Sequence, residues 1–94
     1  MADDITTSHH KSRRRYEIFV GDELAGYLDY RDHDGAVEMY HTVTEPEFGG
    51  RGLASRLAGF ALTDVRDSGL KVVPTCSFVR GFIDRHQEFA DLVA

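Results

Sequence analysis

The sequence predicts a single small α/β domain with a mixed α+β sheet and the element order β-β-β-α-β-α. Three observations support this: short β-rich runs over residues 16–43, one long amphipathic stretch over residues 51–68, and a short apolar run at 70–73. With 94 residues, of which 41% are hydrophobic, the chain has the size and composition of one domain with one core.

Two strands are predicted at residues 16–20 and 24–30. Gly21 and Asp22 between them suit a tight turn, so the two strands should form an antiparallel hairpin. In the second strand apolar and polar residues alternate, which indicates that one face is covered and the other is open.

A third strand is predicted at residues 36–43, after the polar stretch 31–35 reverses the chain. Because side chains alternate along a strand, His41 should share the face of three apolar residues. These are Val37, Met39 and Val43.

A helix is predicted from Arg51, with apolar residues recurring every four positions, and Gly69 is its expected stop. The run 70–73, ended by Pro74, is typical of a buried strand. A second helix is predicted from Ser77 to about Glu88. A right-handed crossover through the first helix would make the third and fourth strands parallel.

The turn Gly49-Gly50-Arg51-Gly52 links the third strand to the helix, at the sheet edge where open α/β sheets bind ligands. Its backbone amides would lie at the positive end of the helix dipole, where phosphate oxygens fit. The alternative is that this glycine turn binds no ligand and has a purely structural role. No Gly-Lys pair supports a P-loop, and Ser55 stands where a dinucleotide motif requires its third glycine.

Residues 1–15 are predicted to be a flexible polar and basic tail, and residues 16–94 the folded domain. The net charge of -5 disfavours nucleic acid or an anionic membrane as partner and is compatible with an amine. No apolar run is long enough to span a membrane, no signal-peptide pattern occurs, and the single cysteine forms no internal disulfide. A cytoplasmic location is therefore expected.

The segment Pro46-x-x-Gly49-Gly50-Arg51-Gly52-Leu53-Ala54 after a strand resembles the coenzyme A motif of the Gcn5-related N-acetyltransferase (GNAT) superfamily. That motif reads Gln/Arg-x-x-Gly-x-Gly/Ala, and here Gly49 occupies its first position, so only backbone contacts remain there. The wider run from His41 to Val93 is similar to the small YjdJ-type branch of the superfamily. With the preceding strands, the resemblance covers about residues 16–93.

The resemblance implies a minimal GNAT fold, acetyl-coenzyme A as cosubstrate, no metal, and transfer of acetyl to a primary amine of a small molecule or protein. The alternative is a non-catalytic acyl-coenzyme A-binding or protein-interaction module with the same fold. The coenzyme would be bound by Thr42, Val43, Gly49, Gly50, Arg51, Gly52, Leu53, Ala54 and Ser55.

Cys76 and His41 are the candidate catalytic residues. Cys76 should lie at the start of the second helix, where the dipole favours a thiolate, and neighbouring parallel strand ends would bring His41 close to it. The plainer alternatives are a small buried cysteine and a half-buried histidine bonded to a carbonyl. Larger GNAT enzymes often use a tyrosine on the last helix as the acid, whereas this helix offers Phe82 and Ile83.

Overall fold

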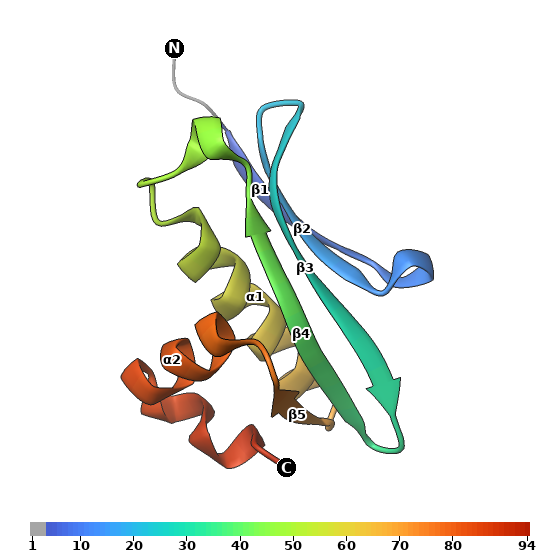
Figure 1. Cartoon of the computed structure of the whole chain (residues 1–94). Coiled ribbons are helices and arrows are strands. Elements are labelled where there is room, and N and C mark those ends of the chain that lie inside the picture. The colour runs from blue at the N-terminus through green and yellow to red at the C-terminus, as the bar shows by residue number, and fades with distance from the viewer. Residues whose placement is uncertain (1–3) are drawn as a thin grey trace.

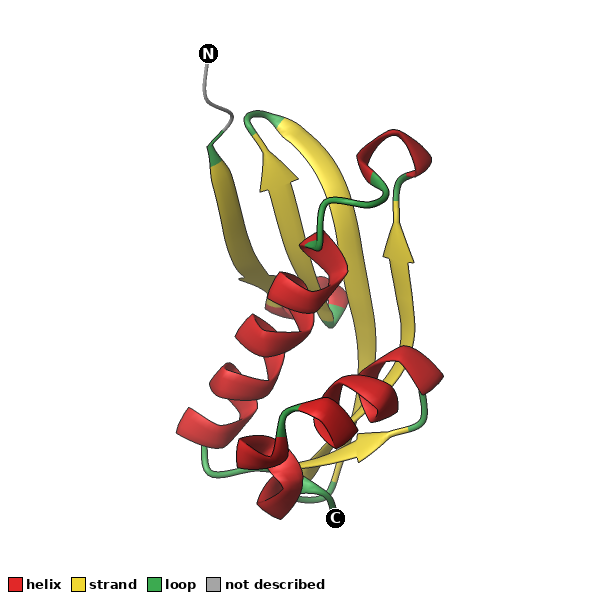
Figure 2. Cartoon of the chain, turned by 90° about the vertical axis from the view of Figure 1, so that its left-hand side faces the viewer, coloured by secondary structure: helices red, strands yellow, loops and turns green. Residues whose placement is uncertain are grey.

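A computed structural model describes residues 4–94, in which a five-stranded mixed sheet carries both helices on one side (Figures 1 and 2). The strands lie in the sheet in chain order, β1 to β4 antiparallel and β5 parallel to β4. The strands are β1 (Ile5–His10), β2 (Arg15–Val20), β3 (Glu23–His33), β4 (Ala36–Thr44) and β5 (Lys71–Pro74). The helices are α1 (Leu53–Asp67), α2 (Ser77–Arg85) and three 3-10 turns, η1 (Lys11–Arg13), η2 (Pro46–Phe48) and η3 (Gln87–Leu92). The mixed fold and the parallel pairing of β4 with β5 across α1 confirm the predicted fold class.

Strand β1 corrects the prediction of a flexible tail over residues 1–15. Residues 5–10 pair in register with β2, from Ile5 opposite Val20 to His10 opposite Arg15. Every second residue of β1 is half-buried, but Ile5 is the only aliphatic one among them, so apolar alternation does not reveal the strand. Residues 1–3 lie outside the part that the structure describes.

Helix α1 packs its apolar stripe on the sheet as the sequence predicts. The residues that recur every four positions are all buried, and they are Leu53, Leu57, Ala61 and Val65. The helix begins at Leu53 and not at Arg51, because Gly52 adopts a left-handed φ of 73° that ends the turn. Its final turn ends before Gly69, whose φ of 74° is again left-handed.

The C-terminal segment returns to the outer edge of β5. Val93 forms a parallel bridge with Val72, and the Ala94 N–H donates to the Val72 carbonyl at 2.9 Å. Strand β5 therefore has a neighbour on both sides near Val72. No helix within residues 4–94 is long and apolar enough to cross a membrane.

Candidate functional site

The glycine turn joins the end of β4 to the start of α1 through η2. Gly50 and Gly52 have φ angles of 80° and 73°, which residues with side chains rarely adopt. Gly52 is the N-cap of α1, no side chain caps the helix, and the Arg56 N–H donates to the Gly52 carbonyl at 3.2 Å. The amides of residues 53–55 therefore precede the first intrahelical bond, at the positive end of the helix dipole. This geometry suits an anion.

The turn is open around its left-handed glycines. A Cβ added at Gly50 or Gly52 would meet no atom within 4 Å. Phe48 of η2 is buried and anchors the turn, and the Arg51 guanidinium lies 5.4 Å from the centre of its ring. The amides are thus held by a packed aromatic residue while the space beside them stays clear.

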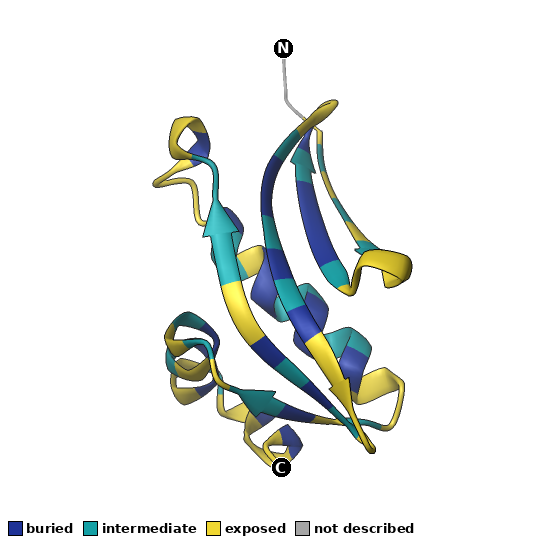
Figure 3. Cartoon of the chain, turned by 45° about the vertical axis from the view of Figure 1, so that its right-hand side comes forward, coloured by how far each residue is buried: buried dark blue, intermediate teal, exposed yellow. Residues whose placement is uncertain are grey.

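Strands β4 and β5 pair only over their first four residues. The register runs from Ala36 opposite Lys71 to Met39 opposite Pro74, and the Cys76 N–H then donates to the Met39 carbonyl at 2.9 Å. Beyond that point β4 continues to Thr44 beside β3 alone, while the chain after β5 turns into α2 (Figure 3). Residues 40–44 therefore present a strand edge without a neighbouring strand, leading to the glycine turn.

A β-bulge at Tyr40 changes which face of the sheet His41 occupies. Met39 lies opposite Tyr30 and His41 opposite Asp29, so Tyr40 is an extra residue in β4. After the bulge, His41 and Val43 share the face of Asp29 and Tyr27, which is the face away from α1. This corrects the prediction that His41 shares the face of Val37 and Met39, because simple alternation does not anticipate an inserted residue.

Cys76 lies at the N-cap of α2, on the other side of β4 from His41. Its Sγ is 3.5 Å from the Thr42 hydroxyl oxygen. Burial raises the pKa of the Cys76 thiol, but hydrogen bonds from the Thr42 side chain and from the backbone amides of Val79, Phe78 and Thr42 lower it, and the net shift is downward. The half-buried thiol is therefore surrounded by donors that favour the thiolate.

The expected approach of His41 to Cys76 does not occur. Successive residues of a strand point to opposite faces, and Thr42 is the residue that contacts the cysteine. His41 is exposed, and its ring centre lies 6.4 Å from that of Tyr27. The structure thus places the two candidate catalytic residues on the two faces of the same strand edge.

Several residues beside His41 are part of its surroundings in the structure but were not predicted from the sequence. Asp29, directly opposite His41 in the sheet, accepts a hydrogen bond from the Arg15 Nε at 2.7 Å. Arg15 also stacks over Tyr27, with its guanidinium carbon 3.8 Å from the ring centre. The alternation of Tyr27 and Asp29 with buried Leu28 marks them as residues of the open face, but only the register shows that they face His41.

Glu38 is another polar residue near this strand edge that sequence reasoning missed. Its carboxylate accepts hydrogen bonds from the Thr75 hydroxyl at 2.6 Å and from His33 at 2.7 Å, at the place where β4 and β5 begin to separate. The Thr75 bond is the main cause that lowers the pKa of Glu38, followed by the His33 bond. No sequence pattern connects these three residues, which come from β3, β4 and the segment after β5.

The mixed α/β sheet, with parallel strands that separate beside a glycine turn, belongs to the class of domain in which this edge commonly binds ligands, and a helix N-terminus there suits anions. The sequence profile described as "GCN5-related N-acetyl-transferase" matches residues 15–92. The chain belongs to this family, in the GNAT superfamily. No curated protein matches it in sequence.

Several solved structures share the fold of this chain. An NMR structure of a protein described as GCN5-like N-acetyltransferase from Staphylococcus aureus has a TM-score of 0.71 and 21% identity, covering 100% of this chain and 91% of that one. A GNAT-family structure from Desulfovibrio desulfuricans has a TM-score of 0.58 and 22% identity, with coverages of 77% and 52%. A Bacillus subtilis acetyltransferase solved with coenzyme A has a TM-score of 0.57 and 14% identity, with coverages of 95% and 74%. At these identities the likenesses show the fold.

Proposed function

We propose that the chain is an acetyl-coenzyme A-dependent N-acetyltransferase that acts on a primary amine. The observation that carries the proposal is the continuity of the glycine turn with the unpaired edge of β4. The pyrophosphate would bind the amides of residues 50–55, and the pantetheine arm would lie along residues 40–44 as an added strand does. The family assignment and the fold shared with a coenzyme A complex support this arrangement.

The two faces of β4 suggest separate roles for His41 and Cys76. An amine arriving at the open face would lose its proton to His41 and attack the thioester carbonyl, breaking the carbon–sulfur bond. Cys76, on the other face, would either protonate the departing coenzyme A thiolate or first take the acetyl group itself. Its hydrogen-bond donors and lowered pKa fit the covalent route, since a nucleophile must be a thiolate.

Binding and turnover separate this proposal from its alternative. Isothermal titration should show saturable binding of acetyl-coenzyme A, and absence of binding at about 1 mM ligand would refute the coenzyme site. Release of free coenzyme A should then require an amine. Replacing a general base typically lowers the rate about 10²- to 10⁴-fold, so the rate of acetyl transfer by His41→Asn should fall by that factor. His10→Asn, at an exposed position of β1, is the matched control and should keep full activity.

A non-catalytic acyl-coenzyme A-binding module is the second candidate. The observation that favours it is that α2 offers Phe82 and Ile83, which are buried and have no ionisable group, where an acid would be needed. Tight binding of acetyl-coenzyme A without turnover on any amine would support the module. Cys76→Ala distinguishes the chemical routes, because only the covalent route predicts an acetylated protein that this variant cannot form.

A further inference from the structure

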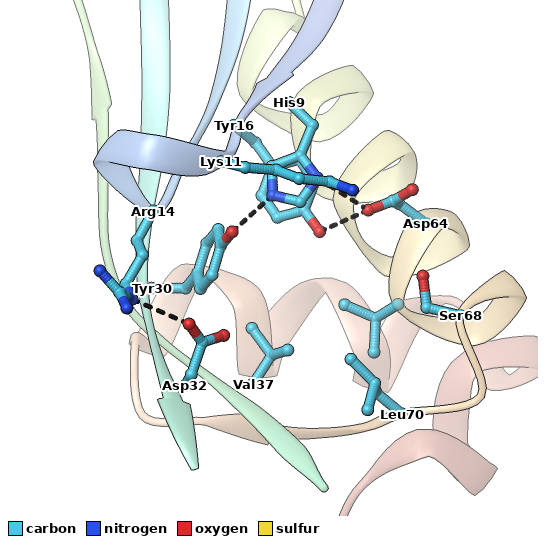
Figure 4. A pocket seen from close by; sticks show the side chains of 11 residues that line it. His9, Lys11, Arg14, Tyr16, Tyr30, Asp32, Val37, Asp64, Ser68 and Leu70 are labelled. Carbon is cyan, nitrogen blue, oxygen red and sulfur yellow. Dashed lines mark hydrogen bonds and ion pairs between the residues drawn. The ribbon is translucent and has the colours of Figure 1, made fainter. Parts of the chain in front are cut away.

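A pocket separate from the coenzyme turn lies between α1, η1 and the lower ends of β3 and β4 (Figure 4). Its volume is about 290 Å³. Its apolar wall is formed by Val37, Val65 and Leu70. Asp64 is twelve residues beyond Gly52, which corresponds to about 18 Å along α1 at the usual helical rise. A ligand here would therefore not touch the glycine turn.

Four polar side chains form one hydrogen-bonded network on a wall of this pocket. The His9 ring lies between Tyr30 and Asp64. Its Nε2 is hydrogen-bonded to the Tyr30 hydroxyl, and its Nδ1 lies 3.1 Å from the Asp64 Oδ2. The Tyr16 hydroxyl donates to the same Asp64 oxygen at 2.8 Å, and its ring stacks on His9 at 4.1 Å. The network joins β1, β2 and β3 to α1.

The His9 ring is harder to protonate in this network than a histidine in water. Burial, with a further contribution from the charge of Lys11, lowers its pKa, against the opposing effect of the Asp64 charge. A neutral ring that donates from Nδ1 to Asp64 accepts at Nε2 from Tyr30, so each bond has one donor and one acceptor. In this arrangement Asp64 accepts both of its hydrogen bonds, from His9 and from Tyr16. Both bonds that reach it from residues 4–94 go to Oδ2, and none goes to Oδ1.

The charged side chains around the pocket carry both signs. Lys11 and Arg14 come from the η1 side, and Asp64 and the Ser68 hydroxyl come from α1 (Figure 4). Arg14 is also paired with Asp32 at 2.8 Å. Two cations and two carboxylates sum to zero, so the pocket is unsuited to a polyphosphate or a polyamine and suited to a ligand that carries both charges.

The backbone at Arg14 supports a binding role. Its φ and ψ of 51° and 57° are left-handed, and within residues 4–94 no other non-glycine residue has a positive φ. This conformation costs about 1–2 kcal/mol for a residue with a side chain. Such conformations recur at ligand sites, and the Arg14 side chain lines this pocket.

We propose that this pocket binds a small zwitterion of the class of a free aliphatic α-amino acid. The ammonium group would pair with Asp64, and Ser68 would accept a hydrogen bond from it. The carboxylate would face Lys11 and Arg14, and the aliphatic side chain would lie on Val65 and Leu70. The bound ligand would tie η1 to α1, so it stabilises the fold by mass action.

Titration calorimetry with L-leucine is the test, together with leucinamide, which lacks the carboxylate, and 4-methylpentanoate, which lacks the ammonium. L-leucine should bind saturably below about 10 mM, and each analogue at least about 10-fold more weakly. Amide resonances of residues 11–14 and 64–68 should shift, and those of 49–52 should not. No saturable binding of L-leucine, or equal binding of the three compounds, would overturn the proposal.

Matched variants locate the binding site. Asp64→Asn keeps one acceptor oxygen, which can take the bonds of both Tyr16 and His9, but loses the charge. It should weaken leucine binding at least about 10-fold, whereas Asp67→Asn on the same helix should not. Lys11→Gln should likewise weaken it, and Arg13→Gln, outside the pocket, should not. Both pocket variants should bind coenzyme A normally. Equal leucine affinity in Asp64→Asn and Asp67→Asn would overturn the assignment.

Discussion

Replacing Gly52 by alanine tests whether the glycine turn binds the coenzyme through its backbone. At the observed φ of 73° an alanine costs about 1–2 kcal/mol, and the loss of unfolded-state freedom offsets about 0.4–1 kcal/mol of this. No atom lies within 4 Å of the added methyl group, so no clash adds to the cost. The net loss is about 1 kcal/mol, which lowers the Tm of a domain of this size by about 5 °C.

The same methyl group should damage coenzyme binding by a larger amount. It would occupy the clear space beside the amides of residues 53–55, where the pyrophosphate is proposed to lie. Losing one hydrogen bond to a charged group costs about 1.5–3 kcal/mol, so the Kd for coenzyme A should rise by about 10- to 150-fold.

Gly35→Ala is the matched control. Gly35 lies in the hairpin between β3 and β4, with a φ of 75° and no atom within 4 Å of an added Cβ. Thermal denaturation should show the same decrease in Tm for both variants. In calorimetric titration with coenzyme A, only Gly52→Ala should bind more weakly. If both variants bind coenzyme A like the original chain, the backbone-binding argument is refuted.

Three further predictions concern the sheet, β1 and the cysteine. Gly26→Ala would place a Cβ 2.7 Å from the Val43 carbonyl oxygen and should cost about 1–3 kcal/mol in urea denaturation. Gly59→Ala, inside α1, would make only an ordinary 3.6 Å contact with Phe82 of α2 and should stabilise by up to about 1 kcal/mol. Equal effects of the two substitutions would contradict the close approach at Gly26. Burial lowers the pKa of His9 below the unfolded value of 6.5, so the unfolded chain binds more protons at this residue, and the free energy of unfolding should fall as the pH drops from 6.5 through the folded pKa. In urea denaturation, His9→Gln should show a shallower pH dependence than the original chain. An unchanged pH dependence would contradict this. Thr42→Val removes a hydrogen bond that lowers the pKa of Cys76, so the midpoint of iodoacetamide alkylation against pH should move upward, and an unmoved midpoint would exclude the hydroxyl as a partner.

The sequence predicts those elements whose stability comes from apolar periodicity or from glycine and proline. The stripe of α1 and the stop at Gly69 are examples, since each depends on residues a few positions apart. Strand β1 could not be found this way, because its inward residues after Ile5 are Thr7 and His9. His9 is accommodated by Tyr30 and Asp64, which lie far along the chain.

Within the candidate site, too, only the part that depends on residues close together in the sequence could be predicted. The glycine turn is local, and its conformation follows from the residues that form it. The face of His41 depends on the bulge at Tyr40, which no glycine or proline marks and which only the pairing with β3 reveals. The contact between Thr42 and Cys76 depends on where β5 ends relative to β4, and this too is a property of the pairing.

The return of the C-terminus beside β5 has a consequence for the solubility of the protein. Val93 and Ala94 occupy the outer edge of β5 near Val72, so on this side of the sheet the exposed strand edge is residues 40–44 of β4. Unpaired strand edges promote aggregation by pairing with other chains. The proposed coenzyme would cover this edge when bound, and the ligand-free protein should then be the more aggregation-prone form, with coenzyme A acting as a solubilising additive during purification.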